Sequence, residues 1–236
     1  MDLFKEKIKF LLSKIFPLAV LDRLKQNIIW RNILKENKIE FIAETKKRLK
    51  HSEFNKKIRN VVWEEIAKFL GTSSKIIYIE LGVWEGYSIN YFSKLFTNKE
   101  SKFIGFDTFT GMPEKWRHMD VGHYDQSENL PKFADDRIKL YKGVFQDTLD
   151  NYLKNLNLDK ETKILINFDC VLYTSTLFCL TKIEHYFKDY FFVFDEFYGD
   201  ECRAFKHFVD SYKKDFELIV GSKSNYAPEV VFGRFK

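Results

Sequence analysis

Two apolar runs of the sequence end in carboxylates. The run ILINF at 164–168 is followed by Asp169, and FFVF at 191–194 is followed by Asp195 and Glu196. If these runs are neighbouring strands, three carboxylates converge in one cleft and repel one another unless a cation neutralises them. Mg²⁺ binds oxygen ligands of this kind, so the pattern predicts a divalent-metal site. The alternative is that Asp195 and Glu196 cap a loop and Asp169 hydrogen-bonds the ammonium group of a ligand.

A second group of residues is typical of a nucleotide-like ligand. Glu80, Gly82 and Gly86 form an E-x-G-x-x-x-G pattern after the run IIYIEL, and Asp107 follows the next run, KFIGF. The glycines allow a ligand to approach the backbone closely, and an acid at this strand end can bind both hydroxyls of a ribose. The alternative is a pair of loop glycines and a capping aspartate. The pattern is not the dinucleotide fingerprint G-x-G-x-x-G, and no G-K-[ST] phosphate loop is present.

The elements that would position these residues alternate along the chain. Short apolar runs predict strands, and apolar residues at helical spacing predict helices between them. This alternation predicts an α/β fold with a mostly parallel sheet, whose ligands bind beyond the carboxyl ends of the strands. The strands are expected at 76–83, 102–107, 137–143, 163–169 and 190–196, the helices at 88–96, 146–156, 175–187 and 202–214, and an antiparallel terminal hairpin at 216–221 and 229–235.

The first 70 residues differ in charge from the rest. Residues 1–60 hold 16 Lys/Arg and 7 Asp/Glu, whereas the remainder is slightly acidic. Helical spacing predicts helices over 3–16, 20–50 and 54–70, with Pro17 between the first two. We expect these basic helices to cover the body or to build a homo-oligomer, with weak contact to anionic lipid as the alternative. The acidic body argues against binding of nucleic acid.

Other features concern the cellular compartment and a covering loop. Three cysteines give no disulfide or zinc pattern, which favours a reducing cytoplasm. The apolar stretch at 10–21 contains Lys14 and Pro17, is too short to span a bilayer, and lacks the cleavage site of a signal peptide. Residues 112–130 are polar and contain Pro113 and Gly122, which is typical of a long loop or lid.

Several blocks together resemble a known family. The blocks are IYIELGVWEGYS, FIGFDTFTGMPEKW, YKGVFQDTL, FDCVLYTST and FVFDEFYGDECRAF, all within 76–215. In their order and spacing the chain resembles the macrocin-type sugar O-methyltransferases, which are class I S-adenosylmethionine-dependent enzymes. The resemblance implies a Rossmann-like methyltransferase domain over 71–236, with a seven-stranded, mostly parallel sheet, an antiparallel last strand and a lid at about 112–130. Residues 1–70 match much less clearly and would form the N-terminal helical segment.

The resemblance also implies residue positions. It places the methionine end of S-adenosylmethionine, its ribose and adenosine, and its adenine at three successive strand ends. Asp169, Asp195 and Glu196 would bind a divalent metal, expected to be Mg²⁺, which holds the acceptor hydroxyls and lowers their pKa. The cofactor residues would be Glu80, Gly82, Val83, Gly86 and Ser88 for methionine, Asp107, Thr108 and Phe109 for ribose and adenosine, and Gly143, Val144 and Phe145 for adenine.

Val171 departs from the family pattern. Many relatives carry an acid at this position as a proposed general base, and others carry a histidine at the next, where this chain has Leu172. Neither residue accepts a proton, so a base would come from elsewhere, such as His123 or His118 in the lid. Asp169 and His123 are the catalytic candidates.

The predicted function is metal-assisted methylation of a sugar hydroxyl. The acceptor would be a small molecule, a sugar or sugar nucleotide, on an activated or glycosidic intermediate of surface-polysaccharide or natural-product biosynthesis. One alternative is methylation of an already acidic oxygen, such as a phosphate, phosphoramidate, carboxylate or phenol. The other is a cofactor-binding protein with impaired catalysis.

Overall fold

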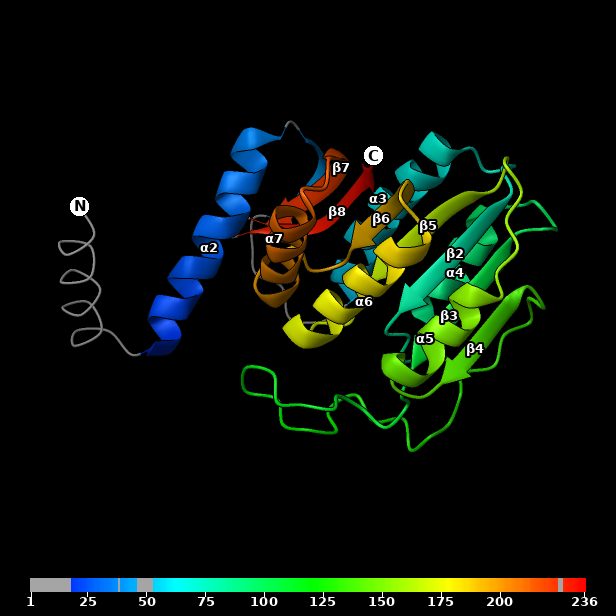
Figure 1. Cartoon of the computed structure of the whole chain (residues 1–236), viewed down its shortest axis with the longest axis horizontal. Helices are drawn as coiled ribbons and strands as arrows, with labels where there is room; N and C mark the ends of the chain where they lie inside the picture. The colour runs from blue at the N-terminus through cyan, green and yellow to red at the C-terminus, as the bar shows by residue number, and fades with distance from the viewer. Residues whose placement is uncertain (1–17, 38, 46–52, 225–226) are drawn as a thin grey trace.

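The computed structural model describes residues 18–37, 39–45, 53–224 and 227–236. Its centre is one eight-stranded sheet in the order β1-β7-β8-β6-β5-β2-β3-β4 (Figure 1). β8 runs antiparallel to both of its neighbours, β7 and β6, and all other neighbouring pairs are parallel. The strands are β1 (Glu40–Thr45), β2 (Ile76–Leu81), β3 (Lys102–Asp107), β4 (Ile138–Lys142), β5 (Lys163–Phe168), β6 (Tyr190–Phe194), β7 (Phe216–Ser224) and β8 (Pro228–Phe235).

Helices cover both faces of this sheet. The apolar side chains of one sheet face pack with α2, α5, α6 and α7, and those of the other face pack with α3 and α4. Burial on both faces explains why the central strands are continuously apolar rather than alternating. The helices are α2 (Leu18–Glu36), α3 (Glu53–Leu70), α4 (Tyr87–Leu95), α5 (Phe145–Lys154), α6 (Tyr173–Tyr186) and α7 (Asp200–Tyr212).

The predicted Rossmann-like α/β fold is confirmed, including the antiparallel terminal hairpin. The strand order reverses between β5 and β2, because the chain adds β3 and β4 on one side and β5 and β6 on the other. A crevice at such a reversal is where open α/β sheets bind ligands. The long loop after β3, green in Figure 1, runs along the side toward which the arrowheads of β2 and β4 point.

The N-terminal part of the prediction needs correction. Instead of one helix over 20–50, α2 ends at Glu36 and residues 40–45 form β1, which pairs in parallel with β7. The sheet therefore has eight strands rather than seven. The helix predicted over 3–16 lies outside the described residues, and the domain boundary at residue 70 stays a prediction. None of the described helices is both long and apolar enough to cross a membrane.

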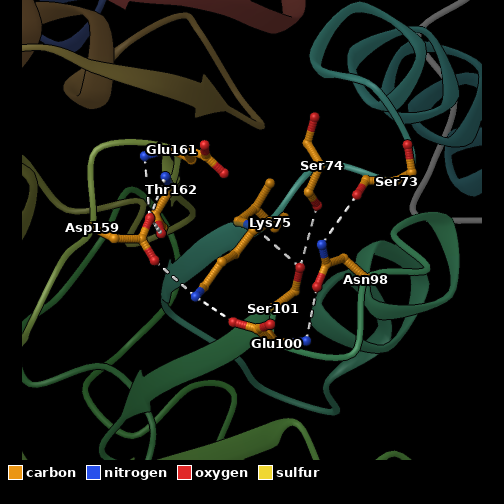
Figure 2. Close-up of polar contacts among 10 residues, drawn as sticks. Ser73, Ser74, Lys75, Asn98, Glu100, Ser101, Asp159, Glu161 and Thr162 are labelled. Atoms are coloured by element: carbon orange, nitrogen blue, oxygen red, sulfur yellow. Dashed lines mark hydrogen bonds and ion pairs between the residues drawn. The ribbon is translucent and has the colours of Figure 1, made fainter.

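A polar network joins the opposite, amino-terminal edge of the sheet (Figure 2). Lys75 Nζ, just before β2, lies 2.5 Å from Glu100 Oε2 and 2.8 Å from Asp159 Oδ2. The Ser101 hydroxyl accepts a hydrogen bond from the backbone N–H of Ile76 at 3.1 Å. These contacts connect the loops before β2, β3 and β5 and stabilise the register of the strands at their amino-terminal ends. The candidate site lies at the opposite, carboxyl ends.

Candidate active site

The carboxyl ends of the central strands surround a cavity of about 1000 Å³. One part of its wall consists of the loops after β2, β3 and β4, which the sequence assigns to a cofactor. Another part consists of the residues after β5 and β6, and the long loop after β3, whose residues 112–130 are the predicted lid, lines a third side. Arg59, from α3, also lines this cavity together with Asp169 and Glu196.

The loop after β2 is organised by the side chain of Asp107. Asp107 Oδ2 accepts hydrogen bonds from the backbone N–H groups of Val83 at 2.7 Å and Trp84 at 2.9 Å, and Oδ1 accepts from Phe109 N–H at 2.8 Å. Oδ1 also lies 3.5 Å from the Thr108 hydroxyl, so contacts within the chain use all four acceptor positions of the carboxylate, the last of them by a long contact that a ligand hydroxyl in the cavity would have to replace. Asp107 therefore shapes the loop as well as facing the ligand space.

The position of Gly82 excludes a side chain for steric reasons. Its φ is +94°, and a Cβ atom at this position would lie 2.2 Å from the backbone oxygen of Asp169. The glycine thus lets the loop after β2 contact the loop after β5, which brings the cofactor side and the carboxylate side of the cavity together. The sequence predicted that Gly82 lets a ligand come close to the backbone. In the structure, the group that comes close to Gly82 is the backbone of Asp169.

The other predicted cofactor residues divide into two groups. Thr108, Gly143, Val144 and Phe145 line the cavity with Gly82 and Asp107. The rest lie behind this wall. Glu80 is fully buried and accepts hydrogen bonds from the hydroxyls of Ser88, at 2.9 Å, and Tyr78. Residues of the second group support the wall rather than forming it: Glu80, Val83, Gly86, Ser88 and Phe109.

The carboxylates after β5 and β6 do converge as predicted, and an arginine accompanies them. Arg59 Nη1 lies 2.9 Å from Asp195 Oδ2, whose side chain has no exposed surface. Burial raises the pKa of Asp169, and the neighbouring Asp195 raises it further. Burial likewise raises the pKa of Asp195, which Arg59 opposes. The sequence reasoning missed Arg59.

These residues do not form a metal site in the present arrangement. Among the described residues, no three His, Cys, Asp or Glu side chains are placed to hold a metal ion together. Asp195, one of the three predicted ligands, is instead paired with the guanidinium of Arg59.

Val171 packs beneath the lid. Its side chain lies in an apolar cluster, the lid cluster, formed by Met112, Trp116 and Leu172 with Met119, Tyr124 and Val171. Its φ is +53°, which is an outlier for a β-branched residue. Its N–H donates to Glu201 Oε1 at 3.0 Å, and Glu201 is buried. Residue 171 is thus part of the contact between the turn after β5 and the long loop after β3.

The lid is docked on two helix starts. Trp116 Nε1 of the lid donates to Asp200 Oδ2, at the start of α7, at 3.2 Å. The hydroxyl of Thr174, at the start of α6, donates to Glu114 of the lid. Of the two lid histidines proposed as bases, His123 lines the cavity and His118 is not among its lining residues. The structure thus favours His123 over His118 as a residue that reaches the site.

The comparisons with known proteins give structural neighbours only. No protein-family model and no curated protein matches the sequence. Among solved structures, CalS11, a TDP-rhamnose 3'-O-methyltransferase of calicheamicin biosynthesis, is 22% identical, with 73% of this chain and 77% of that chain covered and a TM-score of 0.49. PaMTH1, an S-adenosylhomocysteine-bound methyltransferase from Podospora anserina, is 15% identical over 75% and 78% of the chains, with a TM-score of 0.49.

A third neighbour is an O-methyltransferase from Bacillus cereus in complex with S-adenosylhomocysteine. It is 9% identical, with 75% of this chain and 80% of that chain covered and a TM-score of 0.48. At such low identities the likeness of the folds assigns no activity to this chain. An activity has to be argued from the cavity itself.

Proposed function

We propose that this protein is an S-adenosylmethionine-dependent O-methyltransferase that acts on a hydroxyl of a small acceptor, a sugar or sugar nucleotide. One observation carries the proposal. A single cavity joins the loop wall of Gly82, Asp107 and Gly143 to the carboxylates Asp169 and Glu196. Cofactor and acceptor would therefore lie in one space, which is what direct transfer between two bound molecules requires.

The residues of the chain have separate tasks in this scheme. When bound, the cofactor supplies an electrophilic methyl group on a positively charged sulfur. Asp107 would hold the ribose hydroxyls, and the backbone around Gly82 would border the methionine end. The acidic wall of the cavity favours a cationic sulfonium by simple attraction. The lid excludes water when it is docked through Trp116 on Asp200.

Asp169 is the proposed proton acceptor. The carboxylate of Asp169 would take the hydroxyl proton as the acceptor oxygen bonds to the methyl group, which the cofactor would supply from a sulfonium that leaves as a neutral thioether. A buried carboxyl group with a raised pKa is a stronger base than an exposed one. His123, on the cavity wall, is the alternative proton acceptor.

The charge of the cavity favours a neutral acceptor. Arg59 pairs with Asp195 and does not neutralise Glu196 or the ionised form of Asp169, so an acceptor with an anionic oxygen at this place would be repelled. This argues for a sugar hydroxyl over a phosphate or carboxylate. Surface-polysaccharide or natural-product assembly is the setting we propose for such an acceptor.

Acceptor-dependent transfer of a labelled methyl group tests the proposal. Nucleotide sugars and glycosides would be screened with S-adenosylmethionine for labelled product and S-adenosylhomocysteine. We expect turnover with at least one neutral sugar, a loss of about 10²–10⁴ in kcat for Asp169→Asn, and unchanged cofactor binding in that variant. Methylation of acidic acceptors alone, or full activity of Asp169→Asn, would contradict the proposed acceptor or the proposed base.

A further inference from the structure

The carboxylate cluster (Asp169, Asp195 and Glu196) has a positively charged neighbour, Arg59. The side chain of Asp195 has no exposed surface, and Arg59 and Trp63 are the neighbours that favour its charged form. A buried carboxylate in such a position is costly unless it is paired with a cation. Arg59 Nη1, 2.9 Å away, provides that pairing.

Arg59 belongs to the site although it comes from outside the strand ends. It lies on α3, on the second face of the sheet, and lines the cavity together with Asp169 and Glu196. Its side chain keeps 24% of its surface exposed, so it is not sealed behind Asp195. Burial alone would lower the pKa of Arg59, but Asp195, Asp169 and Glu196 outweigh this effect and raise it. Arg59 therefore stays charged at every pH at which the protein is folded.

We propose that Arg59 takes the place of a divalent metal in this cavity, as a permanent counter-ion of Asp195 and a donor toward the acceptor. A guanidinium has five N–H donors, so a contact with Asp195 leaves others for an acceptor oxygen. Asp169 is then left to take a proton rather than to bind an ion. The acceptor part of this inference rests on the proposed function, whereas the exchange of a metal for an arginine does not.

The experiment measures metal binding and stability without the cofactor. Mn²⁺ is titrated into the full chain and its free fraction is followed by electron paramagnetic resonance, while Tm is recorded in EDTA and in millimolar Mg²⁺ or Mn²⁺. For the wild type we expect no stoichiometric Mn²⁺ binding and the same Tm in all three solutions. For Arg59→Met we expect a Tm in EDTA lower by at least about 6 °C, the scale of a broken buried ion pair in a chain of this size. Added Mn²⁺ should bind to this variant and recover part of the loss.

Two further variants show whether the expected Mn²⁺ binding is specific to the loss of Arg59 or follows the loss of any paired arginine. Arg137 also forms a half-buried ion pair, with its Nη2 2.6 Å from Asp135 Oδ2, but at the amino-terminal end of β4, whereas the carboxylate cluster follows the carboxyl ends of β5 and β6. Arg137→Met should therefore lower Tm without any response to Mn²⁺. Arg59→Lys keeps a point charge and should be intermediate in Tm and still fail to bind Mn²⁺.

Clear results would overturn the inference. Stoichiometric binding of Mn²⁺ to the wild type would show that a metal and Arg59 are not alternatives. An Arg59→Met protein with wild-type Tm and no Mn²⁺ site would show that Arg59 is not the counter-ion. If Arg59→Met does not fold, the wild-type titration and Arg59→Lys decide the question. A failure of the proposed function would instead be seen as absent cofactor binding, which none of these titrations measures.

Discussion

At the scale of single residues, the site is shaped by side chains whose neighbours change their chemistry. Val171 has a backbone conformation that suits asparagine or aspartate better, yet its side chain is needed where the turn after β5 meets the lid cluster. Asp169, two residues earlier, lines the cavity at the start of the same turn. We infer that residue 171 contributes packing and leaves the acid–base chemistry to its neighbours.

A carboxylate at residue 171 tests the charge of the acceptor. For a neutral hydroxyl, Val171→Asp should leave kcat/KM intact or raise it, because the new group relieves the backbone strain and can accept a proton. For an anionic acceptor the same change should raise KM and lower kcat/KM, and more so at low salt, because screening weakens at low ionic strength. Steady-state kinetics at two salt concentrations measure this. Val171→Asn is the control, since it loses the same packing without adding charge. A salt-dependent loss in the aspartate variant alone would contradict a neutral acceptor.

Sequence reasoning reached some of these residues and not others. The carboxylates and glycines at strand ends stand in short blocks whose types and spacing indicate chemistry, and the structure brings Gly82, Asp107, Asp169 and Glu196 to one cavity. Arg59 gives no such signal, because it is one of many cations in a basic segment. Three neighbouring carboxylates indicate that a cation lies near them, and the sequence pattern predicted a metal ion rather than an arginine.

At the scale of elements, the strands buried on both faces were predictable and β1 was not. The runs of β2, β3, β5 and β6 are continuously apolar and β-rich, so their boundaries fall within a few residues of those predicted. The segment EFIAET contains two glutamates and lies at the sheet edge, where pairing with β7 decides its conformation more than its own propensity. Local periodicity cannot show a pairing between residues 180 positions apart (Glu40 and Val220).

The connection between β2 and α4 predicts a dependence of stability on pH. Glu80, on β2, is fully buried and held by Ser88 of α4, and burial raises its pKa from 4.5 to about 8. Between these two values the folded chain keeps a proton that the unfolded chain has lost, so this group's stabilisation is complete below pH 4.5 and is lost as pH rises through about 8. Glu80→Gln should therefore lose less unfolding free energy than the wild type between pH 5 and pH 8.

Denaturant unfolding at the two pH values measures this difference. Glu217→Gln is the control, because the pKa of this surface carboxyl is lowered by Arg234 and its contribution does not change over that range. Equal losses in Glu80→Gln and the wild type would mean that Glu80 is already ionised in the folded protein.

At the scale of the whole molecule, the site combines residues of the sheet with a residue of the N-terminal segment. The loops after β2, β3 and β4 supply the ligand-facing backbone, β5 and β6 supply carboxylates, and α3 of the basic N-terminal segment supplies Arg59. The N-terminal part of the chain was expected to cover the cleft or to build an oligomer. Its described helices α2 and α3 pack on the sheet, and α3 contributes the charge of Arg59 to the cavity wall, while a cover over the cleft and an oligomer stay predictions.

Titration of S-adenosylhomocysteine into the protein by calorimetry tests the central claim, that the cavity is a cofactor site for methyl transfer. We predict saturable one-to-one binding in the wild type. Asp107→Ala should weaken it by about 1.5–3 kcal/mol, the scale of a lost charge-assisted hydrogen bond. Because Asp107 also holds three backbone N–H groups, circular dichroism must first show that the variant is folded, and Asp125→Ala, at another acid of the cavity wall, is the matched control. Absence of binding to the wild type at millimolar ligand, or unchanged affinity in a folded Asp107→Ala protein, would contradict the account.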